Sequence, residues 1–410
     1  MTVTLESYEP IVGRQLVEEL RLLAQRVGSR RIRHVNSTAV GGGVAEILTR
    51  MVPLLQEMGL DTRWDVIKGG EAFFQVTKKI HNALHGQPLT LSRQEIQIFL
   101  ETNAENSRTL SLEGEIVFIH DPQPIALVAK KPRQGSRWIW RCHVDVSDPQ
   151  PAVWRFLRTY VARYDAAIFS SPQFVARLPI RQFLIAPSID PLAKKNEELS
   201  PETVASVLHR LGIPRDLPLV TQISRFDLLK DPVGVIEAFR LVRKSVACRL
   251  VLAGGGATDD PEGAQVLADV RTKAAGDSMI HVLELPPGSD LEINALQRAS
   301  TVIIQKSLRE GFGLTVSEAL WKGKPVVASA VGGIPLQIAH RYNGMLCHSI
   351  DGAAFCLKQL LNNPAYAKRL GENGREHVRH NFLLTRHLKE YLLLMIALEH
   401  AEDLIHLPVS

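Results

Sequence analysis

The chain has 410 residues, of which 45% are hydrophobic and 22% are charged, as is typical of a soluble globular protein with a sizeable core. No uninterrupted apolar stretch approaches the ~18 residues of a membrane span, and the N-terminal segment lacks the pattern of a secretory signal. The net charge of +5 suits an anionic small molecule and is too weak to indicate nucleic acid. This length predicts two to three domains.

Strands and helices alternate from end to end, which predicts parallel sheets built from βαβ units. In the first half, the expected strands are Arg31–Asn36, Thr62–Ile67, Glu115–His120, Trp138–Val144, Ala166–Ser170 and Phe183–Ala186. In the second half, they are Leu219–Ser224, Arg249–Ala253, His281–Leu285, Thr301–Gln305, Pro325–Ala328 and Gly344–Cys347. Such a number of strands is too large for one comfortable sheet, so the sequence predicts an α/β protein with two Rossmann-like domains.

The domain boundary is expected in Pro187–Ser200, because this segment is rich in proline, charge and polar residues. Residues 1–188 then form the first domain and residues 189–384 the second. The leucine-rich C-terminal segment, residues 385–410, is expected to form a helix that crosses back to the first domain. The two domains are expected to face each other across a cleft.

Metal and redox chemistry find little support in the sequence. The four cysteines, at positions 142, 248, 347 and 356, have no metal-ligand spacing and indicate reduced, buried thiols in a cytoplasm. Asp259 and Asp260 are adjacent acids before a proline, a pattern that more often caps a helix than binds a divalent ion. We therefore expect no essential metal or other cofactor. An amphipathic helix near Leu16–Val27 carries several arginines, which we interpret as a solvated face and not as a membrane contact.

The first domain offers polar groups where its strands end. After Asn36 comes a triple glycine, whose members Gly42 and Gly43 allow backbone to approach a phosphate or sugar closely. The pattern is not GxGxxG, so it does not indicate nicotinamide binding. The third strand ends in His120-Asp121-Pro122-Gln123-Pro124, where polar side chains are held by two prolines.

The strand over Arg137–Val146 is expected to place Arg141, His143 and Asp145 on one face. A half-exposed strand with a salt-bridged face would explain this pattern equally simply. Because helices should cover both faces of a parallel sheet, we favour a binding site at the end of this strand.

In the second domain, Arg225 and Lys230 follow the strand LVTQIS. A guanidinium and an ammonium five residues apart at a strand end suit a diphosphate held from two sides. Solvated surface side chains are the alternative.

Two glutamates, Glu310 and Glu318, flank a Gly-Phe-Gly turn between a buried strand and a helix. Ligands bind at this end of open α/β sheets, and the helix N-terminus there offers N–H groups to an anion. Carboxylates repel phosphate, so we expect them to accept hydrogen bonds from sugar hydroxyls. For Glu318, which is expected in the first helical turn, a capping box with Thr315 is an equally good explanation.

Together these residues resemble the retaining glycosyltransferase family with the GT-B fold and the E-x7-E motif. Within it, the segments HVNSTAVGGGVAEIL, HDPQP, WIWRCHVD, PSIDPL and REGFGLTVSEALWKGKP are similar to trehalose glycosyltransferring synthases, which join glucose from a nucleotide-glucose to free glucose. The resemblance covers essentially the whole chain. One departure is Asp231, where family members often have glycine, and we expect it to reshape that loop.

The resemblance implies a role for each matching position. The implied catalytic residues are His143, Arg225, Lys230 and Glu310. The implied donor-binding residues are Gly42, Gly43, Phe312, Gly313, Leu314, Thr315 and Glu318. The implied acceptor-binding residues are Asn36, Asp121, Gln123 and Arg141. The implied partners are small molecules, namely nucleoside-diphosphate glucose, glucose and trehalose. A homodimer is compatible with the resemblance.

Three other functions stay open at this point. The first is a retaining trehalose phosphorylase, whose family shares much of the pattern but is generally longer. A nucleotide-sugar epimerase and a non-catalytic sugar-nucleotide sensor are the other two. The sequence does not determine the nucleotide base of the donor, whether trehalose is made or broken down, or the oligomeric state. A different acceptor within the same family also stays open.

Overall fold

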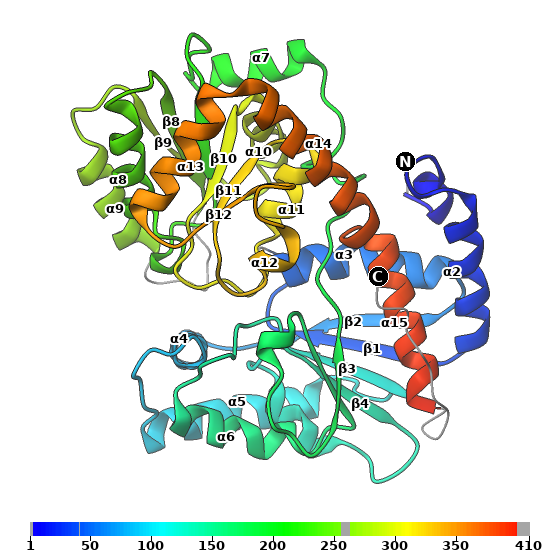
Figure 1. Ribbon diagram of the computed structural model, residues 1–410. Coiled ribbons are helices and arrows are strands. Elements are labelled where there is room, and N and C mark those ends of the chain that lie inside the picture. Colours follow the sequence, from blue (N-terminus) through cyan, green and yellow to red (C-terminus); the bar gives the residue numbers. More distant parts are fainter. Residues whose placement is uncertain (1–2, 41, 256–262, 400–410) are drawn as a thin grey trace. The chain divides into compact units, whose positions relative to one another are not determined.

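A computed structural model describes residues 3–40, 42–255 and 263–399 of the chain. It divides into two compact units. Unit 1 contains the described residues of Met1–Ser188 and Leu384–Ser410, and unit 2 is Ile189–Leu383. Each unit is built around one parallel six-stranded sheet, so the expected α/β class is confirmed (Figure 1). Gly41, Asp259 and Asp260 lie outside the described residues.

The sheet of unit 1 has the strand order β2-β1-β3-β4-β5-β6. Its strands are β1 (Arg31–Asn36), β2 (Asp61–Val66), β3 (Ile116–His120), β4 (Arg137–Arg141), β5 (Ala166–Phe169) and β6 (Arg181–Leu184). Its helices are α1 (Glu9–Val12), α2 (Arg14–Val27), α3 (Gly43–Glu57), α4 (Glu71–Leu84), α5 (Arg93–Thr109), α6 (Pro151–Val161) and α15 (Leu384–Glu399). Short 3-10 helices cover Leu5–Tyr8 (η1), Ile125–Lys130 (η2) and Pro172–Phe174 (η3).

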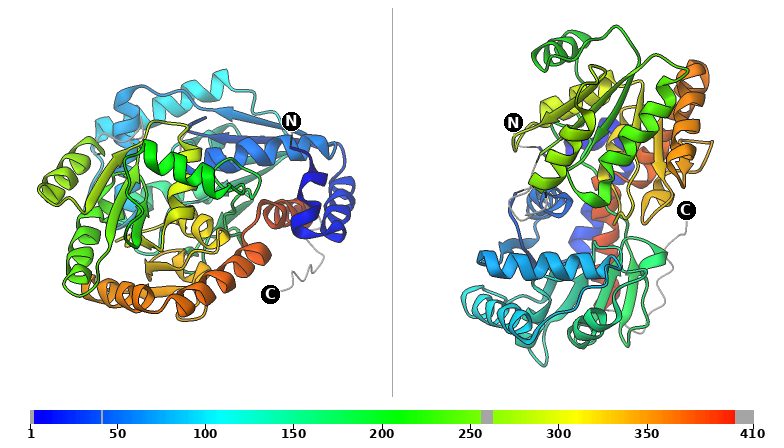
Figure 2. Two further views of the ribbon diagram at one scale, coloured as in Figure 1. Left: turned by 90° about the horizontal axis from the view of Figure 1, so that it is seen from above. Right: turned by 90° about the vertical axis from the view of Figure 1, so that its left-hand side faces the viewer.

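Helices cover both faces of this sheet, as the second view shows (Figure 2). On one face, strand residues such as Val117 and Trp140 pack with Phe73 and Phe99 of helices α4 and α5. On the other face, α15 packs beside α2 and α3. The predicted return of the C-terminal helix to the first half of the chain is therefore confirmed for α15, and residues 400–410 of the expected helix lie outside the described residues.

The sheet of unit 2 has the strand order β12-β11-β10-β7-β8-β9. Its strands are β7 (Leu219–Ile223), β8 (Arg249–Gly254), β9 (Ile280–Glu284), β10 (Val302–Gln305), β11 (Val326–Ser329) and β12 (Met345–Cys347). Its helices are α7 (Pro201–Arg210), α8 (Pro232–Arg243), α9 (Gly263–Ala274), α10 (Asp290–Ala299), α11 (Leu314–Trp321), α12 (Ile334–Gln337), α13 (Ile350–Asn362) and α14 (Pro364–Asn381). The 3-10 helix η4 covers Leu228–Lys230.

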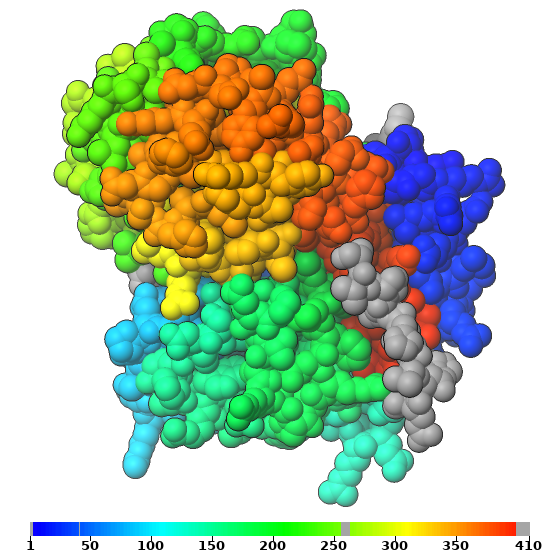
Figure 3. Space-filling view, in the orientation of Figure 1, coloured from blue at the N-terminus to red at the C-terminus, as the bar shows by residue number. Residues whose placement is uncertain are grey.

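Two separate hydrophobic clusters line the faces of this second sheet. Leu250 and Leu252 of β8 point to the cluster under α8 and α13, whereas Val251 and Ala253 point to the cluster under α7 and α10. Helices α13 and α14 form much of the surface of unit 2 in the space-filling view (Figure 3). Because both faces are covered, the strands are apolar at nearly every position. Every expected strand is present in the described residues, with its ends displaced by a few positions.

Most of the segment Pro187–Ser200, expected as a linker, is held against unit 2. The two units divide after Ser188, and the residues that follow pack onto unit 2. Asn294 donates hydrogen bonds to the carbonyls of Lys194 and Glu197, each at 2.8 Å. The segment therefore makes hydrogen bonds to a neighbouring helix, although several of its charged side chains are exposed.

None of the helices in the described part of the chain combines the length and apolar character that a membrane span needs. The four cysteines are free and buried. No group of three or more metal-ligating side chains comes together within the described residues.

Candidate active site

Lys230 and Glu310 meet at the carboxyl end of the sheet of unit 2. They lie 80 residues apart in sequence, but β7 and β10 are neighbouring strands and the loop after each strand brings the two side chains together. Lys230 Nζ lies 2.5 Å from Glu310 Oε2, and Ser307 Oγ donates to the same oxygen at 3.2 Å. The Glu310 side chain is only 8% exposed. The sheet edge therefore holds a partly buried ion pair.

The loop after β7 also carries Arg225, whose side chain is 41% exposed. Its guanidinium lies 3.9 Å from the carboxylate of Asp227. Asp227 in turn accepts the backbone N–H of Leu229 at 2.7 Å and caps the short helix η4. The two predicted cationic residues therefore differ, since Lys230 is held by an acid and Arg225 reaches toward solvent.

Asp231 occupies a position that favours glycine. Its φ of 49° lies in the left-handed region, and its carboxylate accepts the N–H of Gly234 at 3.0 Å, capping α8. The same carboxylate also pairs with Lys306. Aspartate here adopts the left-handed conformation that a glycine would also favour, and the expected reshaping of the loop stays a prediction.

The turn after Glu310 sets the start of helix α11. Gly313 is the N-cap residue with φ 83°, and Leu314 is the first helical residue. Thr315 is therefore the second helical residue, and the expected capping box with Glu318 is wrong, as is the placement of Glu318 in the first turn. The turn is fixed from outside by Gln337, whose amide donates to the carbonyl of Phe312 at 2.5 Å.

Glu318 is the most deeply buried of the predicted donor-site acids, with a side-chain exposure of 1%. Its Oε1 lies 3.0 Å from Lys195 Nζ. Its Oε2 is buried and has no hydrogen-bond partner among the described residues. A buried carboxylate oxygen without a partner is costly, so Glu318 has one acceptor position free for a hydroxyl. Lys195 escaped the sequence analysis because the segment around it has the composition of a linker.

In unit 1, Asp121 is a strained residue at the end of β3, with φ 66°. Its Oδ1 accepts the backbone N–H of His143 at 2.7 Å, and its own carbonyl accepts the indole N–H of Trp140 at 3.0 Å. Burial raises the pKa of Asp121 to about 7. The carboxyl group is thus fixed in place and easily protonated.

His143 is joined to two histidines that the sequence analysis did not assign to the site. His143 Nε2 lies 3.2 Å from Nδ1 of His120, and Nε2 of His120 lies 3.1 Å from Nδ1 of His34. Burial lowers the pKa of all three imidazoles, to about 3 for His34. The three rings are therefore neutral at ordinary pH.

Arg141 is fully buried and donates from Nη2 to the carbonyl of Ile185 at 2.7 Å. Its Nε and Nη1 have no hydrogen-bond partner among the described residues. The expected polar face does not continue past it, because β4 ends at Arg141. Asp145 instead accepts from the backbone N–H and hydroxyl of Ser147, at 2.9 and 2.6 Å, in a local turn.

The remaining predicted residues of unit 1 lie at the ends of β1 and β3. The amide of Asn36 is engaged at both ends, accepting from Trp64 Nε1 at 2.8 Å and donating to Thr38 at 2.7 Å. Gly42, with φ 82°, caps α3, and Gly43 is its first residue. Gln123 has a buried Oε1 without a partner in the described residues.

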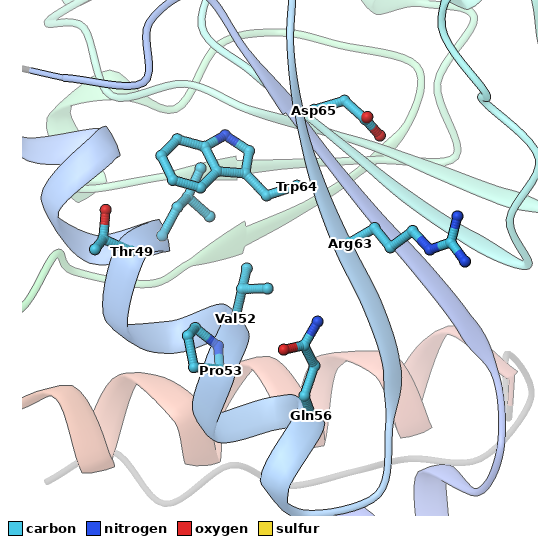
Figure 4. Close-up of a pocket in the computed structure, with 8 residues that line it drawn as sticks. Thr49, Val52, Pro53, Gln56, Arg63, Trp64 and Asp65 are labelled. Atoms are coloured by element: carbon cyan, nitrogen blue, oxygen red, sulfur yellow. The ribbon is translucent and has the colours of Figure 1, made fainter. Parts of the chain in front are cut away.

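A pocket lies between α3 and the edge strand β2 (Figure 4). Trp64 projects from β2 toward the helix, and Gln56 of α3 donates to the carbonyl of Thr62 at 2.7 Å. The residues that line it are Leu48, Thr49, Val52, Pro53, Gln56, Arg63, Trp64 and Asp65. None of these is a predicted site residue, and Trp64 of the pocket donates a hydrogen bond to Asn36 at the end of β1.

In each unit, polar groups gather where the strands of a parallel sheet end. Unit 2 brings together Lys230 and Glu310, and unit 1 brings together Asp121, His143 and the buried histidines. The predicted roles of these residues in binding and catalysis stay predictions.

The fold and these residues define a glycosyltransferase with the GT-B fold. Residues 208–377 match the family "Glycosyl transferases group 1". A sucrose-phosphate synthase from Thermosynechococcus elongatus has a similar structure, with a TM-score of 0.71 and 18% identity over 91% of this chain and 100% of that one.

Residues 34–176 match the family "Trehalose synthase, N-terminal domain". The chain is 44% identical to a trehalose synthase of Rubrobacter xylanophilus, over 96% of this chain and 97% of that protein. It is 43% identical to a trehalose synthase of Pyrococcus horikoshii over 95% of both chains. A trehalose phosphorylase of Pleurotus pulmonarius is 29% identical over 91% of this chain but only 58% of its own length. The chain belongs to the trehalose synthase family.

Proposed function

We propose that this enzyme transfers glucose from a nucleoside-diphosphate glucose to free glucose, forming trehalose with retention of configuration. The contact between Lys230 and Glu310 carries the proposal, because it places a cation for phosphate and an acceptor for sugar hydroxyls within 2.5 Å of each other. The similarity to trehalose synthases along nearly the whole chain supports the choice of product.

On the donor side, Glu310 accepts hydrogen bonds from hydroxyls of the transferred glucose. Lys230 and Arg225 stabilise the negative charge that develops on the departing phosphate, as preorganised cations do. Glu318 has a free buried oxygen that suits a hydroxyl of the nucleotide ribose. The N–H groups at the start of α11, next to Phe312 and Gly313, suit the phosphate charge.

On the acceptor side, Asp121 orients the acceptor glucose, and His143 hydrogen-bonds a hydroxyl of the transferred sugar. The unpartnered nitrogens of Arg141 and the unpartnered Oε1 of Gln123 offer a donor and an acceptor for further hydroxyls. Asn36 acts less directly, since its amide already holds Trp64 and Thr38. Gly42 and Gly43, which we assign to the donor, keep the start of α3 open to close approach.

We propose a front-face substitution for the chemical step. The bond between the anomeric carbon and the phosphate oxygen breaks, and the acceptor hydroxyl forms the new bond on the same face. The proton of that hydroxyl passes to an oxygen of the departing phosphate. Retention by double displacement would need a carboxylate close to the anomeric carbon. We assign that role to neither Glu310 nor Glu318, because they pair with Lys230 and Lys195.

A trehalose phosphorylase is the second candidate, because a member of that group is 29% identical to this chain. The lower identity, and the coverage of only 58% of that protein, favour the synthase. The proposal involves small molecules alone, without nucleic acid, membrane or an essential metal. It places the reaction in the cytoplasm, with a homodimer as the assembly to test.

One experiment separates these candidates. The protein is incubated with ADP-, UDP- or GDP-glucose and free glucose, and in parallel with trehalose and phosphate. We expect a non-reducing disaccharide and free nucleoside diphosphate in the first set. Release of glucose 1-phosphate in the second set, without any nucleotide, would establish the phosphorylase instead. The variant Glu372→Gln, which changes an exposed surface side chain, is assayed in parallel and should show wild-type activity.

A further inference from the structure

Three histidines form a continuous hydrogen-bonded relay across three neighbouring strands of unit 1. His34 lies on β1, His120 ends β3, and His143 follows β4. The strands are adjacent in the order β1-β3-β4, and the two contacts between the rings measure 3.1 and 3.2 Å. The relay therefore runs from the buried middle of β1 to the carboxyl end of the sheet, where His143 is half-buried.

The inner end of the relay is closed by aromatic rings. The ring of His34 stacks on Phe118 at 4.8 Å between centroids, with the planes 6° apart, and Tyr391 of α15 lies 6.3 Å away. His34 is completely buried, and its Nε2 has no hydrogen-bond partner among the described residues. At the inner end, the described residues thus offer His34 Nε2 no hydrogen-bond donor or acceptor.

The geometry couples the tautomers of the three rings. A neutral imidazole has one N–H donor and one bare nitrogen acceptor, and each contact between two rings needs one donor and one acceptor. If His120 carries its proton on Nδ1, it donates to His143 Nε2 and must accept from His34 Nδ1. All three rings then carry the proton on Nδ1, and the only alternative places it on Nε2 in all three. Their burial keeps them neutral, because it lowers the pKa of each ring.

The closed end selects between the two states. With the proton on Nε2 throughout, His34 would bury an N–H group that has no acceptor. With the proton on Nδ1 throughout, His34 buries only a bare nitrogen. Orphaned buried N–H groups are the rarer and costlier case, so the Nδ1–H state is favoured.

We propose that His34 and His120 are positioning residues that hold His143 in its Nδ1–H tautomer, so that His143 presents an N–H donor to the substrate. No other group among the described residues bonds Nδ1 of His143. The proposal rests on the proposed function in assuming that His143 meets substrate. It makes His143 a hydrogen-bond donor to a sugar or phosphate oxygen and not a general base. The charged groups that face the relay are Arg141 and Asp121, which flank His143, and the neutral His387 lies on α15.

The test measures the tautomers directly in the full chain without substrate. The protein is labelled with ¹⁵N in its 14 histidines, and two-bond ¹H–¹⁵N spectra distinguish the protonated from the bare ring nitrogen. The three resonances are assigned by single substitutions. We expect His34, His120 and His143 all to carry the proton on Nδ1. A proton on Nε2 of His143, or different tautomers at His34 and His120, would overturn the proposal.

Two near-isosteric variants test the coupling. In His120→Asn the amide nitrogen sits where Nδ1 was and still donates to His143, whereas His120→Leu has the same shape without a donor. We expect His120→Asn to keep the Nδ1–H signature of His143, with kcat within about twofold, and His120→Leu to show both tautomers, with kcat reduced about tenfold.

His209→Leu, on the exposed side of α7, should change neither. An identical tautomer and rate in the Asn and Leu variants would refute the relay. Since the spectra need no substrate, the tautomer result stands even if the trehalose assay fails.

Discussion

The polar sites at the ends of the two sheets are built from different kinds of groups. In unit 2 the site consists of charged pairs, Lys230 with Glu310 and Lys195 with Glu318. In unit 1 it consists of neutral imidazoles linked by hydrogen bonds, beside the buried guanidinium of Arg141 and a carboxyl group whose pKa burial raises to about 7. Under the proposed function, paired charges suit a charged nucleotide donor, and a site made mainly of neutral imidazoles suits uncharged glucose. If the proposed function holds, this difference separates the donor side from the acceptor side.

The largest expected effect comes from Glu310, where the charged site is densest. Glu310→Ala removes the acceptor for sugar hydroxyls and leaves Lys230 without its partner, so we expect kcat to fall by roughly 10²–10³. Steady-state rates with saturating donor and glucose measure this loss. Glu372→Gln, on the exposed surface of α14, should leave kcat unchanged. A near-normal rate in Glu310→Ala would remove Glu310 from the mechanism.

Glu318 should affect donor binding more than chemistry. Glu318→Gln keeps the shape but weakens the acceptor that we assign to the ribose, so the donor KM should rise about tenfold or more while kcat changes little. Competitive inhibition by a nucleoside diphosphate and by its 2′,3′-dideoxy analogue gives the sharper measurement. The wild type should discriminate between them and Glu318→Gln should not. Equal discrimination in both proteins would reduce Glu318 to a partner of Lys195.

Asp121 tests the neutral character of the unit 1 site through pH. Its pKa is about 7 in the folded protein against an ordinary value of 3.8, so the folded state binds the proton more tightly. Stability from this group is present below pH 3.8 and is lost as pH rises through 7.

Asp121→Asn does not lose stability in this way, because its amide does not titrate. Relative to the wild type, its free energy of unfolding should therefore rise by about 2–3 kcal/mol between pH 5 and pH 8, or less where solvent screens the half-buried group. Urea unfolding of both proteins at the two pH values measures the change. Parallel pH curves for wild type and Asp121→Asn would contradict the burial of a titrating carboxyl here.

The smallest effect is expected at Asp231, which supports the charged site from behind. Asp231→Gly relieves the left-handed backbone but loses the cap of α8 and the pair with Lys306, so it should cost about 1 kcal/mol. Asp231→Ala keeps the strain and loses the same contacts, so it should cost about 2 kcal/mol. Thermal unfolding compares the two. If Asp231→Ala is as stable as Asp231→Gly, the left-handed conformation at this position carries no strain.

The strands and the position of Glu310 could be predicted from sequence because both depend on local pattern. Parallel strands covered on both faces are continuous apolar runs, and an acid between such a run and a glycine turn is conspicuous. The start of α11 was misplaced because Gly313 and Thr315 are both acceptable caps on local evidence. Lys195 was missed because a polar segment packed on a helix has the same composition as a linker.

The histidine relay could not be predicted for a different reason. It depends on the register of three strands that are far apart in sequence, and His34 pairs with Phe118 only through the sheet. A single sequence contains no signal for that register. His34 lies two residues before the end of β1, and His120 is the last residue of β3. These positions become meaningful only once β1 and β3 are known to be neighbours.

The most direct test of the account follows the transferred glucose itself. The donor is labelled with ¹³C at the anomeric carbon of glucose, mixed with unlabelled glucose and the full-length protein, and followed by NMR. We predict that the label appears in α,α-trehalose with one nucleoside diphosphate released per disaccharide. Label in a β-linked disaccharide, in free glucose alone, or in glucose 1-phosphate would contradict the account.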